Sequence, residues 1–154
     1  MSARLVAAVL VALATPACAQ QVDADAPFAK SAWKVAKVGC PAGCSAATAA
    51  VLKGQVGQPV QLSATQLVAP FVDPCEGQVH VSLKTMPVVA DVNKGMAPGR
   101  KRLAAADLGV GGSALSGWAR CQGRAGDTNL QRLLVVAANR VVLLSEEQSL
   151  IELR

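Results

Sequence analysis

Residues 130–153 run LQRLLVVAANRVVLLSEEQSLIEL, and this stretch decides which fold the chain adopts. Its apolar runs would fit one helix over 130–144, but two Val-Val pairs favour extended backbone because valine is branched at Cβ. Asn139-Arg140 separates the two valine-rich runs and suits a tight turn, since asparagine tolerates positive φ. We therefore predict three strands here, at 133–138, 141–144 and 150–153.

Five more segments carry the pattern of short strands. The clearest covers 79–84, where apolar side chains alternate with His80, Ser82 and Lys84, so that one face meets a core and the other meets solvent. The remaining four are residues 31–38, 60–65, 88–92 and 116–122. Eight short strands at even spacing predict an all-β fold, a small antiparallel β-barrel or sandwich.

An α+β fold is the alternative. The alanine-rich stretch 46–53 would form a short helix capped by Ser45, and 102–108 would form a second helix ended by Gly109. Both segments are ambiguous, because neither has a clear helical or strand period.

The first 19 residues predict an export signal. Arg4 precedes an unbroken apolar run at 5–14, and the small-residue triplet Ala17-Cys18-Ala19 suits a cleavage site. The run is shorter than the roughly 20 residues that a membrane-spanning helix needs, and no later segment reaches that length. We expect a single periplasmic or secreted domain over 20–154. A lipoprotein anchored through Cys18 is the alternative.

Four cysteines follow the signal. An even number in an oxidising compartment predicts two disulfides, although four cysteines allow three connectivities and the sequence does not choose among them. The pairing that we expect is Cys40–Cys44 with Cys75–Cys121. The second bond would close the longer loop and contribute on the order of 4 kcal/mol to stability in the chain-entropy model.

Composition and motifs argue against several classes of function. The formal charge is +5, only 16% of residues are charged, and the chain has no Tyr for stacking on bases, so we expect no nucleic-acid partner. His80 is the only histidine, and its strand pattern places it on a polar face rather than in a catalytic triad. We find no catalytic constellation and no cofactor motif, and we predict a binding or inhibitor-type protein that is not an enzyme.

Two groups of residues are candidates for contact with a partner. Trp118 and Arg120 lie in a predicted strand, where the indole could line the mouth of a barrel. The densest charge cluster is Arg100-Lys101-Arg102, which suits an anionic partner such as an envelope surface. As an alternative function, Cys40, Cys44 and His80 would bind a soft metal or exchange thiols.

The layout resembles small lipocalin-like and lysozyme-inhibitor-like periplasmic barrels. The residues that carry this resemblance are Trp33, Leu108-Gly109, the segment 118–123 and the closing hairpin 141–154. The resemblance implies a β-barrel that binds a small apolar ligand or a secreted or envelope protein.

Mass spectrometry of the protein recovered from its own export compartment tests the export hypothesis. We expect the mass of residues 20–154 less about four hydrogens, because two disulfides remove four. A chain that retains residues 1–19 would contradict the predicted cleavage, and an acylated Cys18 would identify the lipoprotein instead.

Overall fold

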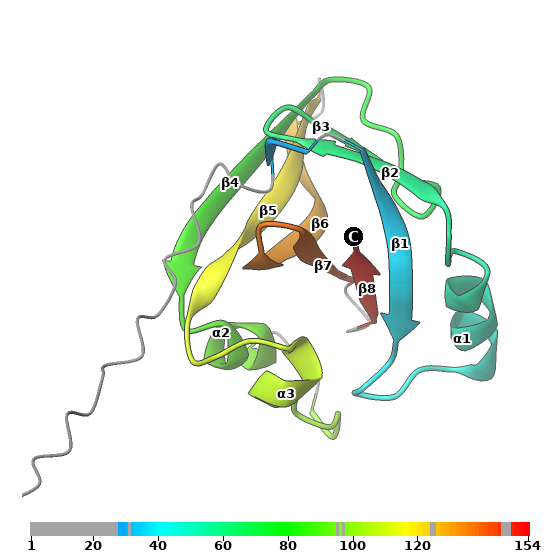
Figure 1. The fold of residues 1–154 in the computed structure, drawn as a ribbon, viewed down its shortest axis with the longest axis vertical. Coiled ribbons are helices and arrows are strands. Elements are labelled where there is room, and N and C mark those ends of the chain that lie inside the picture. Colours follow the sequence, from blue (N-terminus) through cyan, green and yellow to red (C-terminus); the bar gives the residue numbers. More distant parts are fainter. Residues whose placement is uncertain (1–27, 31, 95, 97, 124–125, 146–148) are drawn as a thin grey trace, which may run out of the picture.

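The computed structural model describes residues 28–30, 32–94, 96, 98–123, 126–145 and 149–154, so the predicted export signal and Cys18 lie outside the described residues. Within this part of the chain, eight antiparallel strands form one sheet that curls into a nearly closed barrel, with three short helices (Figure 1). The all-β prediction is therefore confirmed. The strands are β1 Ala32–Gly39, β2 Pro59–Ser63, β3 Gln66–Val68, β4 Gln78–Met86, β5 Ala114–Gly123, β6 Gly126–Ala137, β7 Arg140–Leu144 and β8 Leu150–Leu153, and the helices are α1 Ala46–Lys53, α2 Val88–Lys94 and α3 Ala105–Leu108.

The strands follow one another around the sheet in chain order. Their order is β3-β2-β1-β8-β7-β6-β5-β4, so the last strand returns to pair with the first, and β3 and β4 are the two edges. These edges meet where the backbone N–H of Val81 donates to the carbonyl of Ala64 at 2.9 Å. The barrel thus has one seam, which lies between β3 and β4.

Residues 131–137 of β6, together with β7 and β8, are buried or half-buried on both faces. Leu133 and Leu143 point into the barrel, whereas Leu134 and Leu144 point outward into a second apolar cluster. Strands that are covered on both sides carry nearly continuous apolar runs, because neither face needs polar residues. The three predicted strands are confirmed and the long helix is wrong. The first turn lies one residue earlier than expected, at Ala138-Asn139, because Arg140 already pairs with Ala137 in β7.

Helices α2 and α3 supply the outer half of this second cluster. They lie together at one end of the sheet, while α1 lies outside β1 (Figure 1). Val88 and Val92 of α2 are buried in the cluster with Leu108 of α3. The predicted strand at 88–92 is therefore wrong, since these valines recur at the helical spacing of four and packing overrides their β propensity.

The ambiguous segments form helices at the expected caps. The Ser45 hydroxyl accepts a hydrogen bond from the Thr48 N–H at 3.0 Å and begins α1, and Gly109 ends α3 with a φ of 66°. The segment predicted at 102–108 shortens to α3. Strand β3 was missed, because three residues are too few to show a period.

Both expected disulfides are present, with Cα–Cα distances of 5.7 Å for Cys40–Cys44 and 5.5 Å for Cys75–Cys121. The first closes the loop between β1 and α1, and the second ties the β3–β4 connection to β5. This pattern fits a protein of an oxidising compartment. In the described part of the chain, no helix has the length and apolar content needed to cross a bilayer.

Alanine substitutions on the two faces of β6 test the double burial. We expect Leu133→Ala and Leu134→Ala each to lower the free energy of unfolding by about 2–5 kcal/mol, because both side chains are fully buried. Denaturant titration measures both values. A cost below about 1 kcal/mol for Leu134→Ala would show that the outer face is not a core.

Candidate functional site

A cleft of about 750 Å³ lies at the seam between β3 and β4. We call it the seam cleft. None of the described residues that line it is charged, and most are apolar. They are Thr65, Gln66, Leu67, Val68, Ala69, Pro70, Val72, Pro74, Cys75, Gly77, Gln78 and Val79.

The seam opens because the two edge strands diverge from the point where Val81 and Ala64 meet. Strand β3 has only three residues, and Pro70 and Pro74 in the connection that follows have no N–H with which to extend the pairing. The disulfide from Cys75 to β5 holds the far end of this connection. The floor of the cleft is apolar because Leu67, Ala69 and Val79 also pack in the barrel core.

Sequence patterns did not indicate this cleft. The turn composition at 73–77 was visible, but the divergence of two edge strands depends on pairing between distant segments. None of the residues that we predicted for ligand contact lines the seam cleft.

A second hollow, of about 300 Å³, lies on the outer face of β4, β5 and β6 and surrounds Trp118. We call it the Trp118 hollow. Gly117 lets the strands approach closely here, because a Cβ at this position would lie 1.7 Å from the carbonyl oxygen of Ser82. The lining residues are Ser82, Lys84, Met86, Gly117, Trp118, Arg120 and Arg132.

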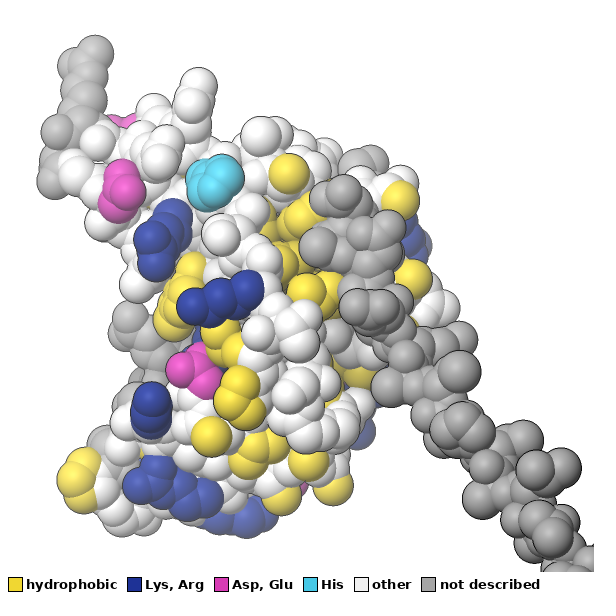
Figure 2. Space-filling view, turned by 90° about the vertical axis from the view of Figure 1, so that its left-hand side faces the viewer, with side chains coloured by type: hydrophobic (Ala, Val, Ile, Leu, Met, Phe, Trp, Pro, Cys, Tyr) yellow, Lys and Arg dark blue, Asp and Glu magenta, His cyan; other side chains and the backbone are white. Residues whose placement is uncertain are grey.

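Positive charge surrounds this hollow. Figure 2 shows the face, with the single histidine in cyan near several Lys and Arg side chains in dark blue. The Arg132 guanidinium lies 5.8 Å from the centre of the Trp118 ring and forms an ion pair with Asp91 of α2. Lys84 and Arg120 are exposed on either side of the indole. The hollow therefore combines an aromatic wall with an excess of cations.

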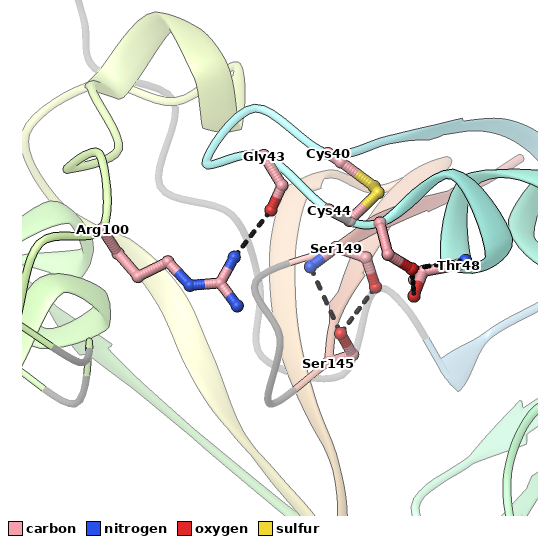
Figure 3. The surroundings of a disulfide bond; sticks show 8 residues. Cys40, Gly43, Cys44, Thr48, Arg100, Ser145 and Ser149 are labelled. Carbon is pink, nitrogen blue, oxygen red and sulfur yellow. Dashed lines mark hydrogen bonds between the residues drawn. A yellow bond between two sulfur atoms is a disulfide. The ribbon is translucent and has the colours of Figure 1, made fainter.

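The structure brings together only part of the predicted contact residues. Trp118 and Arg120 share the Trp118 hollow, as expected for one surface. Arg100 instead donates to the Gly43 carbonyl at 2.9 Å beside the Cys40–Cys44 bond (Figure 3), and Arg102 donates to the Asn93 carbonyl. Lys101 is exposed. Two members of the basic cluster therefore have roles in tying the α2–α3 connection to its neighbours. Sequence analysis missed Lys84 and Arg132 as members of the hollow.

The residues of the alternative metal or thiol function lie apart. The sulfur atoms of Cys40 and Cys44 are bonded to each other, and His80 is exposed on β4 opposite Arg120 of β5. Within the described ranges, no three His, Cys, Asp or Glu side chains are grouped in a way that could hold a metal ion.

A third hollow, of about 480 Å³, is lined by residues of β7, β8 and α3. An ion-pair network between Arg140, Glu152 and Arg154 lies at this hollow. Arg140 donates to Glu152 at 2.8 Å, and Arg154 donates to the same carboxylate at 2.7 Å. The hydrogen bond from Arg140 is the main reason that the pKa of Glu152 is lowered, against the opposing effect of burial, and Arg154 adds to it. Gly109 leaves room for this guanidinium, since a Cβ there would lie 2.8 Å from Nη2 of Arg140. Both arginines form ion pairs with the carboxylate of Glu152, so its charge is already neutralised within the fold and the network has a structural role.

Comparison with models of protein families, with curated proteins and with solved structures found no match. The resemblance to lipocalin-like and lysozyme-inhibitor-like barrels therefore stays a prediction, and the function has to be argued from the geometry of the hollows.

The Glu152 network makes stability depend on pH. A carboxylate whose pKa is lowered on folding stabilises the fold above its ordinary value of 4.5, and this contribution is lost as the pH falls through the folded pKa. We expect the wild type to be more stable than Glu152→Gln at neutral pH, with a difference that shrinks below pH 4.5. Urea unfolding at several pH values measures it, with exposed Glu76→Gln as the matched control. A difference between wild type and Glu152→Gln that stays constant with pH would contradict the lowered pKa.

Proposed function

We propose that this chain is an exported, disulfide-stabilised binding or inhibitor-type protein that acts in the periplasm or outside the cell and holds a small apolar ligand in the seam cleft. The observation that carries the proposal is the cleft of about 750 Å³ at the β3–β4 seam, whose described lining residues carry no charge. Clefts of roughly 300–1,000 Å³ with mainly apolar linings and a few polar groups are typical ligand sites.

The lining favours an apolar ligand without charge. Leu67, Ala69 and Val79 form a floor that is continuous with the barrel core, so an apolar ligand there would extend the core outward. A charged ligand would lose its hydration without gaining an opposite charge from the described lining. The Thr65 hydroxyl and the side-chain amide of Gln78 could orient a ligand by hydrogen bonding, as could the amide oxygen of Gln66, whose NH₂ donates to Gln61 at 3.0 Å.

The boundaries of the cleft favour a compact ligand. The meeting of Val81 and Ala64 closes one end, and the disulfide-tied β3–β4 connection bounds the other. The three residues of β3 span only about 10 Å. These limits favour a compact molecule over a strand of a partner.

The lining also favours binding over catalysis. General acid–base chemistry needs a titratable group within hydrogen-bond reach of the substrate. Among the described residues of the seam cleft there is no histidine, carboxylate or lysine, and the one cysteine is Cys75, which is bonded to Cys121.

Filling the cleft tests the proposal. We expect the wild type to bind Nile red, an uncharged apolar fluorophore, at one site, and Val79→Phe to weaken this binding by about tenfold or more, because the larger ring occupies the cleft. The matched control is Val51→Phe on α1. The valine there is 63% exposed, so a phenylalanine ring at this position would extend into solvent. Fluorescence titration measures both affinities, and thermal unfolding checks that both variants fold.

Equal affinity of Val79→Phe and Val51→Phe would show that the dye binds elsewhere and would remove the seam cleft as the ligand site. Native mass spectrometry of protein recovered from its own compartment gives an independent result. A co-purifying uncharged adduct that Val79→Phe lacks is the outcome that the proposal expects.

A further inference from the structure

Trp118 is placed where a solvent-facing side chain would normally lie. It belongs to neither of the two apolar clusters, whereas Trp33, the other tryptophan, is buried in the barrel core. Its neighbour in the strand, Ala119, points into that core, so the indole points outward from β5. Within the described residues, the indole N–H has no hydrogen-bond acceptor, and the Arg132 guanidinium lies over the half-buried ring. A large aromatic side chain held in this way is available to a partner.

The strand register surrounds this ring with cations. Trp118 lies opposite Ser82 on β4 and opposite Arg132 on β6. Lys84 is two residues from Ser82 on the same face, and Arg120 is two residues from Trp118 in the other direction. Side chains spaced by two residues in a strand project from the same face, so the two exposed cations flank the indole.

The charges of this surface are not balanced. Arg132 is largely buried, with 13% of its side chain exposed, and it is paired with Asp91. No ion pair involves Lys84 or Arg120 in the described part of the chain. Two unpaired positive charges therefore remain beside an apolar wall formed by Trp118 and Met86.

We propose that the Trp118 hollow docks an acidic segment of a partner protein, in which carboxylates contact Lys84 and Arg120 and an apolar side chain between them packs on Trp118. Tryptophan and arginine are enriched among the residues that dominate protein interfaces, and complementary charge gives such contacts their specificity. The hollow of about 300 Å³ suits one or two side chains rather than a whole ligand. Its concave shape also favours a protruding chain over a flat membrane surface.

This proposal does not depend on the seam cleft. Val79 lines the seam cleft from the inner face of β4, whereas Ser82 and Lys84 line the Trp118 hollow from its outer face. The two surfaces can therefore be tested separately, and either one can fail alone.

Charge reversal tests the proposal with the full chain and both disulfides formed. The probe is a synthetic peptide that alternates glutamate with leucine, and the reference peptide has glutamine in place of every glutamate. By isothermal titration calorimetry we expect the wild type to prefer the acidic peptide. We expect Lys84→Glu combined with Arg120→Glu to weaken acidic-peptide binding by about tenfold or more, since both contacts become repulsive.

The matched control is Lys34→Glu combined with Lys53→Glu, which changes the net charge equally at exposed positions on β1 and α1. Equal losses in the two double variants would show non-specific attraction and overturn the proposal, as would equal binding of the two peptides or binding of neither. Binding of phosphatidylglycerol vesicles in place of the peptide would assign the face to a membrane and also overturn it. Trp118→Ala is expected to weaken peptide binding by about tenfold, and an unchanged affinity would remove the indole from the site.

Discussion

Burial of β7, β8 and the second half of β6 on both faces is the constraint on which the rest of the structure depends. The inner face of these strands fills the barrel, so Leu133, Val141 and Leu143 need no other partner than the core. The outer face also carries large apolar side chains, among them Leu134, Val142 and Leu144, which would be exposed if nothing covered them, at a cost of roughly 1.5–3 kcal/mol each. Helices α2 and α3 provide this cover, and the α2–α3 connection is fixed in turn by Arg100 on Gly43. A sheet of eight strands thus acquires a helical layer along part of its outer side.

The extent of that helical layer explains where the half-buried aromatic surface around Trp118 begins. The layer packs over Leu134 and Val142, its cluster extends to Ala114 of β5 and Met86 of β4, and Asp91 of α2 forms an ion pair with Arg132. Trp118 lies on the far side of Arg132, beyond the cover. The same outward face is therefore a core beneath α2 and, one strand position away, the half-buried aromatic surface for which we propose a partner. The boundary is a charged pair because Arg132 packs its stem on apolar atoms while its guanidinium meets the carboxylate.

Local patterns in the sequence predicted most of the sheet but little of the sites. The alternation at 79–84 placed each side chain of β4 on its observed face, since one face is apolar and the other polar. The same kind of argument failed at 88–92, because a short valine-rich run fits a strand and a buried helix equally well and only the tertiary partner distinguishes them. Trp118 and Arg120 could be proposed from their residue types. Arg132 could not, because the predicted strand began at residue 133 and its neighbour on the sheet depends on the register of β5 with β6. The seam cleft lies between β3 and β4, the two ends of the strand order, and no local sequence pattern shows that these two strands do not pair along their length.

The seam itself poses a physical problem, because exposed strand edges invite pairing with other chains. Several features limit this at the β3–β4 seam. Strand β3 is only three residues long, Pro70 follows it closely, and Lys84 projects from β4. The disulfide between Cys75 and Cys121 links the segment just before β4 to β5, which keeps β4 paired with β5. The same devices keep β3 and β4 from pairing with each other along their length. The cleft therefore results from two edges that are protected from pairing, and its apolar floor is formed by residues of these edges that also pack in the barrel core.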